Sequence, residues 1–126
     1  MKPQDFDVWN RFIDKFPTAY EGVQYDLALG LKPPFDTIVV PETGGDQLKL
    51  YLRKIDVVGK IGDRLDIIEV KPIADFSTIG QVKGYLTLYK NLIDPAANAR
   101  AVIVCGTAKP DAFLIAAQEN VQLILV

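Results

Sequence analysis

The sequence from Lys49 to Lys71, KLYLRKIDVVGKIGDRLDIIEVK, contains two apolar runs separated by a short polar stretch. Leucine, isoleucine and valine dominate both runs, a composition that is typical of β-strands. Between the runs lies Gly62-Asp63. Glycine at the first central position of a two-residue loop can adopt the positive φ that tight hairpins need. The segment therefore predicts an antiparallel β-hairpin.

The predicted hairpin has a definite register. With Gly62-Asp63 as its loop, Asp56 lies directly opposite Glu69, and Lys54 lies opposite Lys71. Because side chains alternate along a strand, Asp56, Glu69 and Lys71 are expected on one face. Two carboxylates that face each other repel unless a cation lies between them, and oxygen ligands suit Mg²⁺. We therefore expect a divalent metal ion at this position.

Two motifs in this part of the chain point to a known family. Asp56 followed by Glu69-Val70-Lys71 resembles the Asp…(Asp/Glu)-x-Lys signature of the PD-(D/E)XK nuclease superfamily. The segment from Gly80 to Tyr85, GQVKGY, looks like the Gln-x-x-x-Tyr helix that follows this signature in many members. Ile55 replaces the usual proline, at a position that is often degenerate. The resemblance is strongest from about Arg53 to Tyr89.

The resemblance implies one nuclease-like domain over residues 1–126, with a restriction-endonuclease-like α/β core. It implies Mg²⁺, with Mn²⁺ as a substitute, and a nucleic-acid substrate that is DNA rather than RNA. The expected site residues are Asp56, Glu69, Lys71 and Gln81 for catalysis, Asp56, Glu69 and the backbone carbonyl of Val70 for the metal, and Lys54 and Tyr85 for the substrate. Lys71 is expected to orient the attacking water, and Gln81 to hold that water or a phosphate oxygen.

Each of these residues also has a simpler interpretation. In the simpler interpretation, Asp56 and Glu69 are solvated charges on an open sheet face and pair with nearby lysines. The apolar residues that flank them on both strands argue against this, because they indicate a covered sheet in which charges are expensive. In the same interpretation, Gln81 is an ordinary residue on a helix surface and Tyr85 is a core residue.

Composition narrows the chemistry further. The 126 residues are 49% hydrophobic, which is enough for a core, and carry a net charge of −2 with no Lys/Arg-rich run. This balance counts against unassisted, tight DNA binding. The chain has no histidine, so catalysis by histidine is excluded. The single cysteine, Cys105, allows no internal disulfide, and no apolar stretch is long enough to cross a membrane. We expect a cytoplasmic protein.

Hydrophobic periodicity predicts the elements outside the hairpin. They are a helix at 4–16, a strand at 23–31, a short strand at 37–40, a loop at 41–46, a helix at 78–92, a doubly buried strand at 101–105, a helix at 111–120 and a strand at 121–126. Thr18 to Glu21 could alternatively open a helix. Pro72 is expected to end the second hairpin strand, and Ser77 or Thr78 to cap the helix after it. The order α-β-β-β-α-β-α-β predicts a mixed sheet flanked by helices.

Three function classes follow from these observations. The first is a metal-dependent nuclease that hydrolyses phosphodiester bonds in DNA. The second is a binding or structural module that retains the fold without the reaction, as the acidic balance suggests. The third, an enzyme acting on small molecules with the same carboxylates, has no sequence feature in its favour. A small core with no added recognition domain also suggests a homodimer or a subunit of a larger complex.

Overall fold

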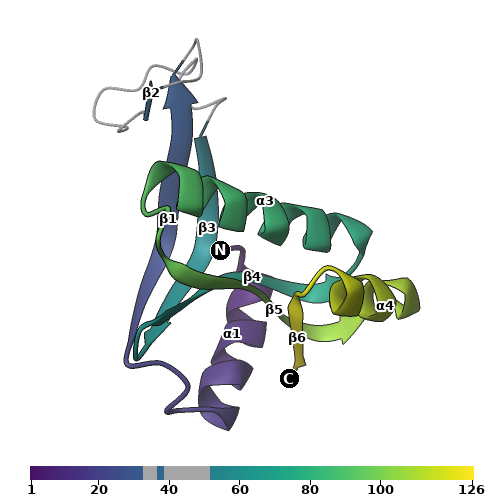
Figure 1. Ribbon diagram of the computed structural model, residues 1–126. Helices are drawn as coiled ribbons and strands as arrows, with labels where there is room; N and C mark the ends of the chain where they lie inside the picture. The colour runs from purple at the N-terminus through teal and green to yellow at the C-terminus, as the bar shows by residue number, and fades with distance from the viewer. Residues whose placement is uncertain (33–36, 39–51) are drawn as a thin grey trace.

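The computed structural model describes residues 1–32, 37–38 and 52–126. Within these residues, six strands form one mixed sheet in the order β2-β1-β3-β4-β5-β6 (Figure 1). The strands are β1 (Gly22–Lys32), β2 (Thr37–Ile38), β3 (Leu52–Ile61), β4 (Arg64–Ala74), β5 (Asn98–Ala108) and β6 (Gln122–Leu125). The helices are α1 (Pro3–Lys15), α3 (Phe76–Leu92) and α4 (Pro110–Gln118). The predicted loop at 41–46 lies outside the described residues.

Strand pairing in the sheet is antiparallel on one side of β4 and parallel on the other. β1, β3 and β4 are antiparallel neighbours, whereas β4, β5 and β6 are parallel. Helix α1 packs on one face of the sheet, and α3 and α4 pack on the other (Figure 1). The predicted α/β class and the predicted order of elements are therefore confirmed, with β2 as the short strand before the hairpin.

Strand β5 shows why its sequence is a continuous apolar run. Val102 and Val104 pack with α1, whereas Ile103 and Cys105 pack with α3 and α4. All four side chains are fully buried, because helices cover both faces of the sheet here. This confirms the prediction of a strand buried on both sides.

The β3–β4 hairpin forms around the predicted loop. Gly62 has φ +57°, as the turn requires, and the strands pair from Ile61–Arg64 to Val57–Ile68. The N–H of Gly62 donates to Oε1 of Glu21 at 3.0 Å, so the residue directly before β1 holds the turn. The predicted register is confirmed over this part of the hairpin.

Pro72 does not end β4, and that prediction was wrong. The strand continues to Ala74 and still pairs with β5 beyond the proline. The N–H of Val70 points away from β5, because it donates to Asp56 of β3. Residues two apart in a strand point their N–H groups in the same direction, so an N–H at position 72 would point toward β3. Because β3 no longer pairs with β4 there, the missing N–H of Pro72 costs no ladder hydrogen bond.

The N-cap of α3 also differs from the prediction. Asp75, rather than Ser77 or Thr78, is the capping residue. Its Oδ1 accepts from the N–H of Thr78 at 3.2 Å, and its own N–H donates to Oγ1 of Thr78 at 3.1 Å. This reciprocal capping box starts the helix at Phe76, two residues earlier than expected.

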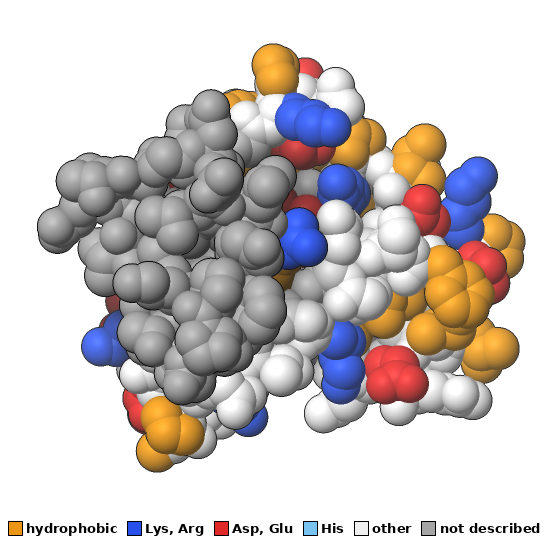
Figure 2. Space-filling model, turned by 90° about the horizontal axis from the view of Figure 1, so that it is seen from above, with side chains coloured by type: hydrophobic (Ala, Val, Ile, Leu, Met, Phe, Trp, Pro, Cys, Tyr) orange, Lys and Arg blue, Asp and Glu red, His pale blue; other side chains and the backbone are white. Residues whose placement is uncertain are grey.

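Some apolar side chains of α1 and α4 are exposed. In α1, Trp9 and Phe12 are buried, whereas Phe6 is 46% exposed. In α4, Ala112 and Ala116 are buried, whereas Phe113 and Leu114 are exposed. Orange hydrophobic side chains accordingly gather at one end of the molecule in Figure 2. No helix in the described part of the chain is long and apolar enough to span a membrane.

Candidate active site

The hairpin strands separate at the predicted acids. Among the described residues, pairing of β3 with β4 stops at Val57–Ile68. Asp56 is therefore not a ladder partner of Glu69, and that part of the predicted register was wrong. Instead, Oδ2 of Asp56 accepts the backbone N–H of Val70 at 2.9 Å. The carboxylate takes the place that a carbonyl of β3 would occupy in a regular ladder.

The neighbouring strand bends at the same level. Asp26 of β1 has φ +53°, and the described β1–β3 ladder omits the pair between Asp26 and Asp56. On either side of this gap the strand changes face. Tyr25 accepts a hydrogen bond from Nε1 of Trp9 in α1 at 3.1 Å, whereas Leu27 packs with α3. In a regular strand these two residues would share one face. The bend therefore lies beside Asp56, whose carboxylate reaches β4 on the other side of β3.

Glu69 lies in an unusual environment for a carboxylate. It is 5% exposed, and its Oε2 has no hydrogen-bond partner in the described structure. Nζ of Lys71 lies 3.9 Å from the other oxygen, Oε1. Burial, followed by the charge of Asp56 and a hydrogen bond with it, raises the pKa of Glu69 to about 8. Burial also raises the pKa of Asp56, although the N–H of Val70 opposes this.

The structure adds a third acid that the sequence analysis did not identify. Asp5, in the first turn of α1, is 5% exposed, and its charge contributes to the raised pKa values of Asp56 and Glu69. It lies on the buried side of α1 with Trp9 and Phe12. The sequence signal that could have identified Asp5 is its position within the apolar stripe of an amphipathic helix, where an acid is unexpected.

The donor set suits a hard cation. Within the described residues, no group of three or more Asp, Glu or Cys side chains is arranged as a metal site. Asp56 and Glu69 nevertheless offer carboxylate oxygens at one gap. The carbonyl of Val70 points to the same side as its N–H, toward Asp56. The unpartnered Oε2 of Glu69 is the observation that fits a bound cation, because a buried carboxylate oxygen needs a partner.

The predicted residues of α3 lie beside this gap. Tyr85 and Gln81 line a groove of about 350 Å³ together with Arg53 of β3. Burial, and then the charges of Glu69 and Asp56, raise the pKa of Tyr85. Tyr85 packs against Ile55 and Ile67, on the face of the sheet that carries Glu69. Gln81 is exposed in the same groove. Lys54 is exposed on β3, and in the described structure no contact joins it to the acids.

This architecture has a counterpart among solved structures. It is similar to the crystal structure of a repair endonuclease from Pyrococcus abyssi, with a TM-score of 0.57 and 17% identity over 96% of this chain. The chain has a nuclease-like fold. It spans 46% of the length of that endonuclease. The sequence matches no protein-family model and no curated protein.

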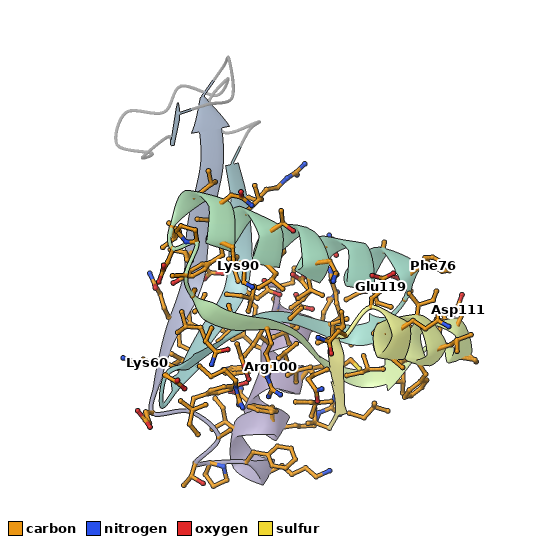
Figure 3. All side chains as sticks on the ribbon, in the orientation of Figure 1. Lys60, Phe76, Lys90, Arg100, Asp111 and Glu119 are labelled. Carbon is orange, nitrogen blue, oxygen red and sulfur yellow. The ribbon has the colours of Figure 1, made fainter. Side chains whose placement is uncertain are left out.

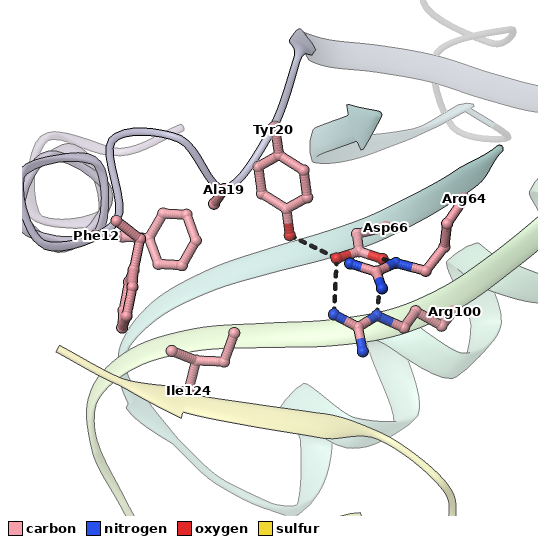
Figure 4. Close-up of a pocket in the computed structure, with 8 residues that line it drawn as sticks. Phe12, Ala19, Tyr20, Arg64, Asp66, Arg100 and Ile124 are labelled. Carbon is pink, nitrogen blue, oxygen red and sulfur yellow. Dashed lines mark hydrogen bonds and ion pairs between the residues drawn. The ribbon is translucent and has the colours of Figure 1, made fainter. Parts of the chain in front are cut away.

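A second polar cluster, which the sequence analysis missed, lies on the other face of the sheet (Figure 4). The carboxylate of Asp66 is fully buried and accepts four hydrogen bonds. They come from Oη of Tyr20 at 2.6 Å, Nε of Arg64 at 3.0 Å, and Nε and Nη2 of Arg100 at 2.8 and 3.1 Å. Burial alone would raise the pKa of Asp66, but these bonds and the arginine charges hold it below its ordinary value.

Replacing Asp66 by Asn is expected to destabilise the fold by about 2–4 kcal/mol, because the two arginines lose a buried, charge-assisted acceptor. The wild-type contribution is present above pH 3.8, the ordinary pKa, and is lost as the pH falls through the lower folded value. Urea unfolding at neutral pH measures the difference. Tyr20→Phe, which removes one of the four bonds, should cost about 1 kcal/mol. Equal losses in the two variants would contradict this account.

Proposed function

We propose that this chain is a metal-dependent nuclease that hydrolyses phosphodiester bonds in DNA. The observation that carries the proposal is the buried, unpartnered Oε2 of Glu69 beside Asp56, at the gap between β3 and β4. Asp56, Glu69 and the carbonyl of Val70 would hold Mg²⁺, or Mn²⁺ in its place. The likeness of the fold to a repair endonuclease supports the same conclusion.

A bound Mg²⁺ would supply a Lewis acid for the scissile phosphate and would lower the pKa of a bound water. The protonation of the Asp56–Glu69 pair is coupled to the binding of this cation. With the pKa of Glu69 near 8, the metal-free pair keeps a proton at neutral pH and releases it when a cation binds. Metal affinity should therefore rise with pH up to about 8.

Lys71 is the residue of this chain that would act on the reacting groups. Its ammonium lies 3.9 Å from Oε1 of Glu69, and its side chain is 29% exposed, so it faces both the acids and the solvent. In this position Lys71 would orient the attacking water and stabilise the negative charge that develops on the phosphate. Gln81 would hold the water or a phosphate oxygen, and Tyr85 and Lys54 would contact the substrate.

Recognition of DNA is expected to need help from a second copy or from a larger complex. The net charge of −2 leaves little general attraction for a polyanion. The chain also spans less than half of the structurally similar endonuclease. Binding should accordingly be weak for the isolated chain, with a shallow salt dependence that corresponds to few phosphate contacts.

The test is cleavage of single-stranded, duplex and branched DNA by the purified chain with Mg²⁺, Mn²⁺ or a chelator. Lys71→Ala should lose a factor of about 10²–10³ in cleavage rate while still binding Mn²⁺. Lys60→Ala is the matched control, because Lys60 is exposed at the far end of the hairpin from α3 (Figure 3). Absence of cleavage, together with absence of Mn²⁺ binding by calorimetry, would indicate a nuclease-fold binding module instead.

A further inference from the structure

We infer that the sugar–phosphate backbone of the DNA substrate runs along the outer face of α3, over Gly80 and Gly84, with a phosphate at Arg53 of β3. This inference rests on the proposed nuclease function and names the part of the chain that receives the strand next to the acids. Its evidence is a pair of glycines, the groove beside them and the position of Tyr85 in that groove on the same face of the sheet as Glu69.

Gly80 and Gly84 have no reason within the described chain to be glycine. They lie one turn apart in the interior of α3, where glycine is less favourable than alanine. Neither has a positive φ, and a Cβ built on either would meet no atom of the described residues within 4 Å. A close approach from outside the chain explains two bare positions on one helix face.

Other glycines of the same chain show the contrast. A Cβ on Gly59 would lie 2.7 Å from the ring of Tyr20, and a Cβ on Gly106 would lie 3.0 Å from the carbonyl oxygen of Pro72. Those two glycines are required by neighbours inside the fold. Gly80 and Gly84 instead have no neighbour at the Cβ position among residues 1–32, 37–38 and 52–126. A bound molecule that needs close approach to the helix backbone would account for them.

The chemistry of the groove suits a nucleic-acid strand. The groove is lined by Arg53, Gly80, Gln81, Gly84, Tyr85 and Leu88. It therefore combines a guanidinium for a phosphate, an amide, and the ring of Tyr85 and the side chain of Leu88 for a sugar or base. Figure 2 looks down on the α3 side and shows Lys and Arg side chains close to Asp and Glu side chains there.

Tyr85 relates the groove to the acid pair, because it lines the groove and packs on the face of the sheet that carries Glu69. Tyr85 packs against the buried cluster that contains Ile55 of β3 and Ile67 of β4. Glu69 lies two residues after Ile67 in β4 and therefore shares its face of the sheet. Oε2 of Glu69 is buried and has no hydrogen-bond partner within the described part of the chain, which independently indicates a ligand at the acids. A strand whose scissile phosphate lies at the acids would pass Tyr85 and follow the glycine face toward Arg53.

Bare helix faces with this spacing also pack against other helices. The position of Arg53 argues for DNA here. A packed helix would bury the guanidinium beside apolar side chains, which is costly without a partner, whereas a phosphate supplies the matching charge. The alternative of a helix partner is separated from DNA by the test below.

The test uses variants whose stability and substrate binding should change in opposite directions. Gly80→Ala and Gly84→Ala should each raise Tm, because alanine favours the helix and meets no neighbour. The double variant should bind a labelled single-stranded oligonucleotide, in Ca²⁺ to prevent cleavage, roughly tenfold more weakly. Its KM for cleavage should rise by a similar factor while kcat is unchanged. Arg53→Ala should weaken binding and reduce the salt dependence by about one phosphate contact.

Thr87→Ala is the matched control, since Thr87 is exposed on α3 outside the groove. It should raise Tm and leave DNA binding unchanged. If the glycine variants cleave and bind like the wild type, the inference is overturned and the nuclease proposal stands. If they instead reduce self-association in sedimentation with no change in DNA affinity, the face binds a helix and the inference is wrong. A wild-type chain that neither binds nor cleaves DNA would overturn the proposed function as well.

Discussion

Replacing Glu69 by Gln is expected to lower DNA cleavage about a thousandfold or more and, at the same time, to stabilise the metal-free protein at pH 8. The loss of activity follows because glutamine removes one anionic oxygen ligand, and metal assistance contributes several kcal/mol to such reactions. The gain in stability follows from the burial of Glu69, whose Oε2 has no partner in the described structure.

The sign of the stability change comes from the pKa of Glu69. Its ordinary value is 4.5 and its folded value is about 8, so the folded state binds a proton that the unfolded state releases. The contribution of Glu69 to the free energy of unfolding is therefore fully present below pH 4.5 and is lost as the pH rises through 8. Glutamine does not titrate, so Glu69→Gln should exceed the wild type by about 2 kcal/mol or more at pH 8.

Urea unfolding with a chelator at pH 5 and pH 8 measures this difference. Addition of Mg²⁺ at pH 8 should then raise the Tm of the wild type and leave that of Glu69→Gln almost unchanged, because only the wild type presents both carboxylates to the ion. A variant that is less stable than the wild type at pH 8 without metal would show that Glu69 is satisfied in the fold. That result would remove the main support for the metal site.

Two replacements of Asp56 are expected to abolish cleavage alike and to differ in stability. Asp56 has two roles, because its Oδ2 accepts the N–H of Val70 and its carboxylate faces Glu69. Asp56→Asn keeps an oxygen for the Val70 N–H. Asp56→Ala leaves this fully buried amide without its acceptor and should cost about 1–3 kcal/mol.

Amide hydrogen exchange at Val70 should be faster in Asp56→Ala than in the wild type, and close to the wild-type rate in Asp56→Asn. Both variants should also show a smaller fall in stability between pH 5 and pH 8, because the charge of Asp56 contributes to the raised pKa of Glu69. Equal stability of the two variants, or cleavage that survives in either, would contradict the double role.

The hairpin was predictable because it is local. Its turn needs a glycine at one position, and its register follows from two apolar runs that are close in sequence. The same locality explains why Asp56, Glu69 and Lys71 are identifiable as one group from the spacing of residues in the hairpin. The separation of the strands at Asp56 was not predictable in this way. It accompanies a bend at Asp26 of β1 and a hydrogen bond to the Val70 amide, which no pattern within the hairpin encodes.

Asp5 and Pro72 illustrate the same limit. Asp5 looks like an ordinary acid in the first turn of a helix, and only the packing of α1 on the sheet places its charge near Glu69. Pro72 looks like a strand breaker, yet β4 continues past it because the side of the missing N–H has already lost its partner strand. Both outcomes depend on neighbours that are distant in sequence.

By itself, the sequence determined the order of helices and strands, the hairpin and the identity of the two central acids, since periodicity and turn chemistry act over a few residues. Only the tertiary structure decided which carboxylate oxygen is buried without a partner, how far the strands separate and which face of α3 is bare. Those properties depend on how α1 and α3 pack on opposite faces of the sheet and on the bend in β1, because burial and electrostatic coupling are set by neighbours in space rather than along the chain.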